Sequence, residues 1–182
     1  MKSFLDRMRS TGKPSPRVGF SHMAWTFLGA FLGILAIERI GFWLELSGFG
    51  YLFLIGSFGA SAVLLYGVPM AEFSQPRNVI GGHVISALVG VSLYQIFGTE
   101  SIWVCPLAVS LAIFAQQFTR TVHPPGGATA LIAVIGGDSI HQIGFIYPFF
   151  PVFAGSTIMV LITVMINNLS KDPNRKYPTY WW

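Results

Sequence analysis

The chain has 182 residues, of which 53% are hydrophobic and only 10% are charged, whereas roughly a quarter of the residues in a soluble domain carry a charge. These proportions exclude a soluble globular protein of this length, because too few charges are present to cover its exterior. We therefore predict one all-α polytopic membrane domain, with room for about five or six helices of ~20 residues.

The basic residues, which give the chain a net charge of +4, gather near its two ends. In a membrane protein such clusters report topology, because loops that stay in the cytoplasm are enriched in Lys and Arg. We expect both termini to be cytoplasmic, the membrane to be a bacterial inner (plasma) membrane, and nucleic acid not to be a partner. Residues 1–18 then form a basic N-terminal tail, 19–168 the transmembrane domain and 169–182 the C-terminal tail.

The first two hydrophobic segments contain glycine in different patterns. The first span is expected from about residue 19 to 37, and its Gly29-x-x-x-Gly33 spacing suits close packing against another helix. The second, from about 49 to 66, contains the run Gly56–Ala62, which favours a kink or break because glycine costs about 1 kcal/mol relative to alanine within a helix. The loop that follows, about 67 to 78, is too polar to span.

The next two spans, about 79–97 and 102–118, are joined by a turn so short that they should be antiparallel neighbours. A helix beginning at Pro125 and closing at Gly136 would rise only about 18 Å, less than the ~30 Å hydrocarbon core, so we predict a half-helix or a re-entrant element there. The last span is expected from about 145 to 165, with two prolines in its first turns.

Six crossings, some of them partial, result from this scheme. Gly59-Ala60-Ser61-Ala62 and Gly127-Ala128-Thr129-Ala130 share the pattern glycine, alanine, hydroxyl, alanine. If this is a true repeat, each half contains three crossings and the two halves are inverted, as in many transporters. In a four-span alternative, both glycine-rich segments dip into the membrane and return, and the same ends stay inside.

Three separated motifs carry a resemblance to a known family. They are His123-Pro124-Pro125-Gly126-Gly127-Ala128-Thr129-Ala130, Gly56-Ser57-Phe58-Gly59-Ala60-Ser61-Ala62 and Gln75-Pro76-Arg77-Asn78-Val79-Ile80-Gly81-Gly82-His83. In this combination the chain resembles the HPP family of integral membrane proteins over roughly residues 20–168. Members similar to it have been assigned to nitrite transport, so the resemblance implies a transporter of a small monovalent anion, with nitrite as the expected substrate.

Helix ends supply the physical argument for an anion site. A helix that begins near Pro125 would leave unpaired N–H groups at Gly126, Gly127 and Ala128, next to the positive end of the helix dipole, and Thr129 would add a hydroxyl donor. If the second span restarts near Gly59, Ala60 and Ser61 offer an equivalent site from the opposite half of the protein. The alternative role of these small residues is helix packing.

Polar side chains near these segments complete the predicted site. His123 is expected either to donate to the anion or carry a co-transported proton, or else to cap a neighbouring carbonyl. Two arginines could attract anions into an inner vestibule or anchor the topology at the headgroups. His83 and Asn78 could join the site or connect neighbouring helices. The predicted substrate-binding residues are His123, Pro124, Pro125, Gly126, Gly127, Ala128, Thr129, Gly59, Ala60, Ser61, Arg77, Asn78, His83 and Arg120.

Catalysis, a metal ion and a cofactor are not expected. The chain has no nucleophile elbow and no Walker-type phosphate loop. His83, His123 and Asp138 lack the spacing of a metal site, and Cys105 is the only cysteine. The expected partners are a small inorganic anion, the lipid bilayer and further copies of the chain in a homo-oligomer. The alternative functions are a passive anion channel of the same fold and a membrane scaffold or enzyme of unknown chemistry.

Overall fold

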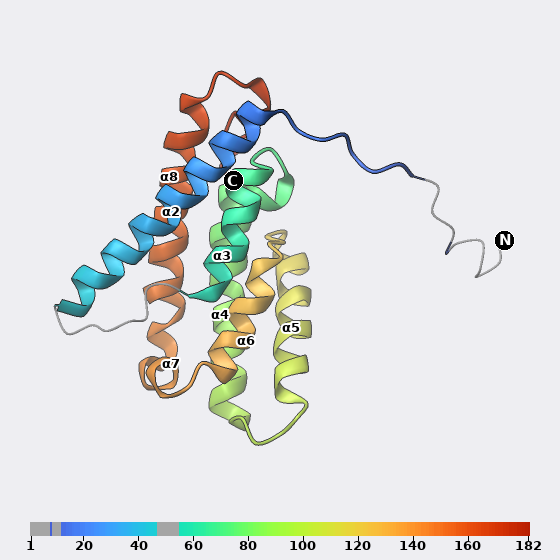
Figure 1. The fold of residues 1–182 in the computed structure, drawn as a ribbon. Coiled ribbons are helices and arrows are strands. Elements are labelled where there is room, and N and C mark those ends of the chain that lie inside the picture. The colour runs from blue at the N-terminus through green and yellow to red at the C-terminus, as the bar shows by residue number, and fades with distance from the viewer. Residues whose placement is uncertain (1–7, 9–11, 47–54) are drawn as a thin grey trace.

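The computed structural model describes residue 8 and residues 12–46 and 55–182, which form helices and no strands (Figure 1). The basic residues Lys2, Arg7 and Arg9 and the expected beginning of the second span near residue 49 lie outside this described part of the chain. The main helices are α2 (Phe20–Leu46), α3 (Gly56–Ala62), α4 (Pro76–Phe97), α5 (Val104–Thr119), α6 (Pro125–Ile135), α7 (Asp138–Ile143) and α8 (Ala154–Leu169). Short π or 3-10 turns complete them: η1 (Val63–Gly67), η2 (Glu72–Ser74), η3 (Gly144–Ile146), η4 (Pro148–Phe153) and η5 (Pro173–Arg175).

Three segments are long and apolar enough to cross a membrane: Phe20–Trp43 in α2, Pro76–Phe97, which is α4, and Pro148–Leu169, which joins η4 to α8. A fourth span results if Pro125–Ile135 and Asp138–Ile146, which meet at an angle of 95°, count as one broken crossing. The all-helical membrane fold is therefore confirmed with three or four spans, while six crossings and an inverted repeat stay predictions.

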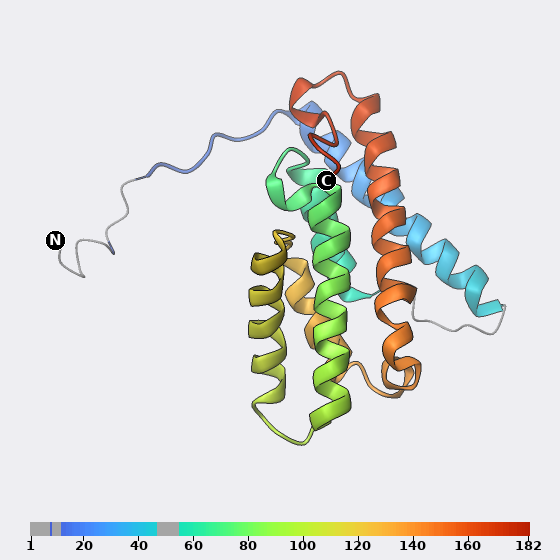
Figure 2. The same cartoon turned by 180° about the vertical axis from the view of Figure 1, so that it is seen from behind.

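Helix α4 is the central element, because α5, α6, α8 and η4 all pack against it (Figures 1 and 2). A side chain at Gly82 would meet the Cβ of His123 at 2.6 Å, and one at Gly90 would strike the backbone of Ala130. Glycine at these positions thus lets α4 lie directly against the segment before α6 and against α6 itself, as small residues do between membrane helices. The predicted tight turn before α5 is also confirmed, since Gly98 reverses the chain with a φ of 63° and α5 lies alongside α4.

The first residues of the two short helices, α3 and α6, can be compared with the predicted helix starts. Helix α6 begins at Pro125 as expected, because proline is tolerated at the first helical position. The expectation that a helix restarts near Gly59 is wrong. Helix α3 already begins at Gly56, so Gly59 lies inside it and does not mark a helix N-terminus. The last span bends at η4, where Phe150 has non-helical dihedrals, before continuing as α8.

Helix α2 lies obliquely at the edge of the bundle against α8 and η1 (Figure 1). The ring of Tyr66 fills the space left by Gly29 and Gly33, and a Cβ at Gly29 would lie 2.5 Å from that ring. The predicted use of the Gly29-x-x-x-Gly33 spacing for close packing is therefore confirmed, although the partner is an aromatic ring on a π turn.

The C-terminal residues fold back onto the bundle, which their prediction as a polar tail did not anticipate. Arg175 and Tyr177 are buried, at 0% and 1% exposure. His22 at the start of α2 lies 3.1 Å from the carboxylate of Asp172, so the start of α2 and the C-terminal segment meet at one end of the bundle. Hydrogen bonds hold the pKa of Asp172 below its ordinary value. The larger effect comes from the backbone N–H of Asn174, and the smaller one from the side chain of His22.

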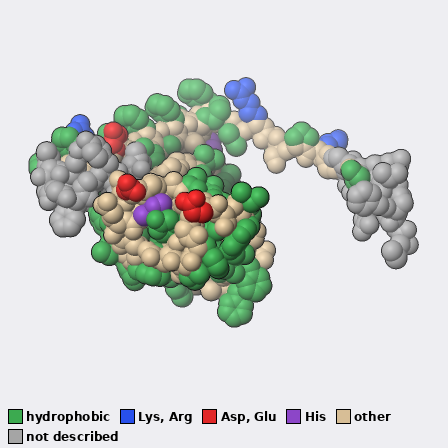
Figure 3. Space-filling model, turned by 90° about the horizontal axis from the view of Figure 1, so that it is seen from below, with side chains coloured by type: hydrophobic (Ala, Val, Ile, Leu, Met, Phe, Trp, Pro, Cys, Tyr) green, Lys and Arg blue, Asp and Glu red, His purple; other side chains and the backbone are tan. Residues whose placement is uncertain are grey.

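The opposite end of the bundle has a different charge. Seen from that side, acidic side chains and a histidine lie within the outline of the bundle (Figure 3). The Lys and Arg side chains in view lie at its margin and on the N-terminal extension. This separation follows the pattern by which positive charge marks one side of a membrane protein.

Arg175 connects the C-terminal segment to three helical elements. Its guanidinium donates to the carbonyls of His22 and Tyr66, to the Thr26 hydroxyl and to the Asn167 amide oxygen. Arg175→Met should lower the free energy of unfolding by about 3 kcal/mol, because hydrogen bonds to a buried charged donor are lost while their acceptors stay buried.

Denaturant unfolding in detergent measures this change. The matched control is Lys176→Met, since Lys176 is the exposed neighbour of Arg175 and its replacement should leave stability unchanged. Equal stability of the two variants would contradict a clamping role for Arg175.

Candidate functional site

Five polar side chains meet in the interior of the bundle, where α3, α4 and α6 converge. Each of them is at most 1% exposed. Two come from α3, one from α4, one from the segment before α6 and one from the second turn of α6. This polar cluster consists of Ser57, Ser61, His83, His123 and Thr129.

Short hydrogen bonds connect the cluster from end to end. The Nδ1 of His123 bonds the carbonyl oxygen of Phe73 at 2.7 Å, and its Nε2 lies 2.8 Å from the Ser61 hydroxyl. That hydroxyl also lies 2.7 Å from the Nε2 of His83, whose Nδ1 bonds Thr129 Oγ1 at 2.7 Å. The Thr129 hydroxyl donates to Ser57 Oγ at 2.9 Å. The chain of bonds therefore runs unbroken across both imidazole rings.

Gln116 positions His123 from the side of α5. Its Oε1 accepts the backbone N–H of His123 at 2.7 Å, and its Nε2 donates to the Ser86 hydroxyl at 2.8 Å. Both Gln116 and Ser86 are buried. Sequence reasoning did not include either residue in the site, although a pair of glutamines near the end of a mostly apolar helix was the available signal.

The N-terminus of α6 is not the open anion site that was predicted. The N–H of Gly126 donates to the His123 carbonyl at 2.8 Å and the N–H of Gly127 donates to the Pro124 carbonyl at 3.1 Å, so both groups are already paired. Gly126 serves helix packing, because a side chain there would lie 2.6 Å from Gln116 Nε2. This outcome corresponds to the packing alternative for Gly126.

The remaining small residues of the two motifs lie away from the cluster. Gly59 and Ala60 are on the exposed face of α3, whereas Ser57 and Ser61 are on its buried face. Gly127 and Ala128 line an apolar pocket of about 550 Å³ between α5 and α6, together with Pro124. The motifs therefore contribute their hydroxyl and imidazole groups to the cluster, and their glycines do not all share one role.

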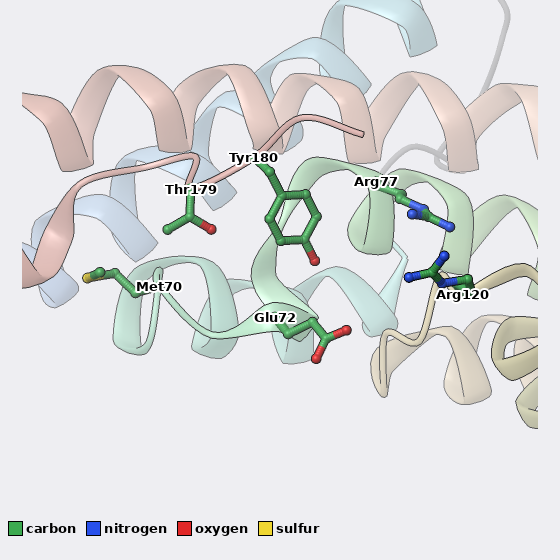
Figure 4. Close-up of a pocket in the computed structure, with 6 residues that line it drawn as sticks. All are labelled: Met70, Glu72, Arg77, Arg120, Thr179 and Tyr180. Carbon is green, nitrogen blue, oxygen red and sulfur yellow. The ribbon is translucent and has the colours of Figure 1, made fainter.

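A separate, polar pocket of about 410 Å³ opens at the end of the bundle where the C-terminal segment folds back (Figure 4). Arg77 and Arg120 extend into it from α4 and from the end of α5, with their guanidinium groups close together and the Glu72 carboxylate across from them (Figure 4). Arg77 is also held by the Thr119 carbonyl, to which it donates at 3.1 Å. This vestibule is lined by Met70, Glu72, Arg77, Arg120, Thr179 and Tyr180.

Asn78 joins the vestibule to the polar cluster. Its Nδ2 donates to the carbonyl of Val122, the residue before His123, at 2.9 Å, and its Oδ1 accepts from the Tyr180 hydroxyl at 3.1 Å. Phe73, whose carbonyl bonds His123, follows the vestibule residue Glu72 directly in the chain. The backbone around Phe73 and Val122 is therefore bonded both to the cluster histidine His123 and to Asn78, which contacts the vestibule residue Tyr180.

Comparison with known proteins gives the family. The model for the HPP transmembrane region matches residues 15–178. The chain belongs to the HPP family. Two curated proteins of Dictyostelium discoideum, each named only as a transmembrane protein, are 42% and 41% identical to this HPP protein over 94% and 98% of its length. It spans 55% and 63% of the length of these relatives, and no solved structure matches it.

The three motifs of this HPP protein that carry the family resemblance meet in the polar cluster. The Gly56–Ala62 motif supplies Ser57 and Ser61, and the motif that ends at His83 supplies that histidine. The His-Pro-Pro-Gly-Gly motif supplies His123 and Thr129. The sequence contained all of these residues, but only the fold shows that they are hydrogen-bonded to one another.

Two adjacent glycines of this HPP protein, Gly126 and Gly127, differ in how tightly their surroundings pack. Gly126→Ala should destabilise the protein by about 1–3 kcal/mol, because the new Cβ would crowd Gln116, Ser86 and the Gly82 carbonyl. Gly127→Ala should leave stability unchanged, since its Cβ would meet only Val109 Cγ1 at 3.7 Å. Denaturant unfolding of both variants in detergent checks this difference, and a larger loss for Gly127→Ala would contradict the packing role of Gly126.

Proposed function

We propose that this HPP protein transports a small monovalent anion across the membrane. Nitrite is the first substrate to test, because the sequence resembles family members assigned to nitrite transport. The observation that carries the proposal is the polar cluster, which places two histidines and three hydroxyl groups within a helical membrane domain. Ionisable and polar groups are expensive in the membrane interior and are usually retained there for a solute pathway or a proton pathway.

The vestibule provides a second line of support. Arg77 and Arg120 bring two positive charges into one pocket, with Glu72 as the single carboxylate among its lining residues. Positive potential in a recessed site concentrates anions and raises their rate of entry. We propose that the anion passes from the vestibule to His123 and Ser61 along the segment 121–123, which follows the vestibule residue Arg120.

The residues proposed to contact the anion differ from the helix-end groups expected initially. Ser61, His83, His123 and Thr129 supply hydroxyl and imidazole groups in place of backbone N–H groups. Such groups can donate to an anion without a permanent charge, which limits the free energy of burying the site when it is empty. Arg77 and Arg120 are proposed to act earlier, by attracting the anion to the vestibule.

The membrane arrangement that suits this function is the inverted repeat of six crossings. Its support is the pairing of the two short helices α3 and α6, which pack together and are joined by the bond from Thr129 to Ser57. We propose that the basic vestibule end faces the cytoplasm, with both termini there, by the positive-inside rule. The inner membrane as location and a homo-oligomeric assembly belong to the same proposal.

A passive anion channel of the same fold is the second candidate function, supported by the direct succession of vestibule and cluster. Purified protein in liposomes separates the two. A carrier gives nitrite uptake that saturates with concentration, whereas a channel gives fast current without saturation. No anion flux in either assay would remove both functions and favour a membrane scaffold or an enzyme.

Arg120→Gln should reduce nitrite uptake at low substrate concentration, because one of the two positive charges of the vestibule is removed. The defect should shrink as salt is added, since ions screen the attraction over about 10 Å at 0.1 M. Arg39→Gln is the matched control, because Arg39 is an exposed arginine on α2 that does not line the vestibule. An equal effect of both substitutions would contradict a specific role for Arg120.

A further inference from the structure

The hydrogen bonds of the polar cluster define which nitrogen of each imidazole carries hydrogen. The Nδ1 of His123 faces the Phe73 carbonyl, which can only accept, so this nitrogen carries hydrogen and donates. The Thr129 hydroxyl gives its hydrogen to Ser57 Oγ, so the hydrogen in its contact with His83 comes from the Nδ1 of that ring. In their neutral forms both histidines therefore present Nε2 as an acceptor.

The Ser61 hydroxyl lies between these two acceptors, at 2.7 Å from His83 Nε2 and 2.8 Å from His123 Nε2. A hydroxyl has a single hydrogen to donate, and in this position it can also donate to the Ser57 carbonyl at 3.1 Å. Two short contacts between Ser61 and the imidazoles need two hydrogens, but the neutral groups supply at most one. One additional proton on either ring satisfies both contacts.

We propose that His83 and His123 form a site for one shared proton, bridged by the Ser61 hydroxyl, and that this proton crosses the membrane with the transported anion. The second part rests on the proposed transport function. A protonated His83 donates its Nε2–H to Ser61 Oγ while Ser61 passes its own hydrogen to His123 Nε2. The positive charge moves from one ring to the other, and Ser61 remains a neutral hydroxyl.

The groups around His83 and His123 make the affinity of this site for a proton depend on a bound anion. In the described part of the chain, the hydrogen-bond partners of both rings are hydroxyl groups, carbonyl oxygens and, for the His123 backbone, Gln116. The ring of Phe58 covers His83 edge-on from α3 and contacts Gly155 of α8. No carboxylate takes part in these contacts, and the charged side chains nearest along the chain, Arg77 before His83 and Arg120 before His123, line the vestibule.

An unpaired charge is costly in such an apolar environment, so the proton alone is held weakly. A proton and a monovalent anion together bring no net charge into the membrane. Each should therefore bind more tightly when the other is present, by the reciprocity of linked binding. The proton is therefore the coupling ion of the proposed carrier, and its charge balances that of the anion.

Ring nitrogen NMR on the full-length, histidine-labelled protein in detergent tests the shared proton directly. His22→Gln and His141→Gln identify the signals of the other two histidines. In the unaltered chain, we expect His83 and His123 to take up one proton between them in a single coupled step, at low pH without an anion and at higher pH when nitrite is added. Both rings remaining neutral across the pH range in which the protein stays folded, or each taking up its own proton independently, would overturn the site.

Ser61→Ala should remove the coupling, because both rings remain but their bridge is lost. Ser156→Ala is the matched control, since Ser156 is a buried serine whose hydroxyl, within the described part of the chain, bonds only the Phe153 carbonyl. In Ser156→Ala, the coupled titration of His83 and His123 should be unchanged. Loss of coupling in Ser156→Ala as well would overturn the role of Ser61. If Ser61→Ala does not fold, Ser61→Thr keeps the hydroxyl and should retain the coupled step.

Proteoliposomes with an internal pH dye connect the site to transport, with protein-free liposomes as the baseline for leakage. We expect nitrite uptake to be accompanied by one proton per anion, to carry no net current and to be lost in Ser61→Ala. A shared proton in the NMR titration without anion flux would defeat the proposed function and leave the proton site intact. Saturable anion flux that carries current without protons, with both rings neutral, would defeat the proton site and leave the transport function intact.

Discussion

The hydroxyl of Ser61 is the point on which this structure depends. It lies within 2.8 Å of imidazole nitrogens from two other elements, and through them it connects α3 to α4 and to the segment before α6. In an apolar interior, a polar group without a partner costs more than it would in water, so such a group selects the arrangement in which it is paired. The bundle satisfies this requirement by closing α3, α4 and α6 around one chain of hydrogen bonds.

Glycine makes that closure possible. Gly82 and Gly90 on α4 and Gly126 on α6 lie where a single methyl group would strike a neighbouring backbone or side chain. Without these close approaches the imidazole of His123 could not lie beside both Ser61 and His83. Close helix packing and the hydrogen bonds of the cluster therefore depend on each other. A substitution at Gly126 would disturb the cluster without contacting any of its five residues.

The end of the bundle beyond the cluster is completed by residues distant in sequence. The C-terminal segment is fixed by the buried guanidinium of Arg175 and by the Tyr177 hydroxyl, which donates to the Ser74 carbonyl at 2.8 Å. This places Tyr180 in the vestibule and against Asn78. The vestibule, with Arg77 and Arg120, thus belongs to the same hydrogen-bonded framework that positions His123.

The sequence by itself determined the all-helical membrane class, the family, the start of α6 at Pro125 and the tight turn before α5, because hydropathy, proline and glycine act locally. It also contained His83, His123, Ser61 and Thr129 within its motifs. Only the tertiary structure decided that Gly126 packs against Gln116 and Ser86, that His83 and His123 meet at Ser61, and that Arg175 is buried. These outcomes depend on contacts between segments far apart in the chain, since a hydrogen-bond partner or a packing neighbour is specified by the meeting of two elements and not by either one alone.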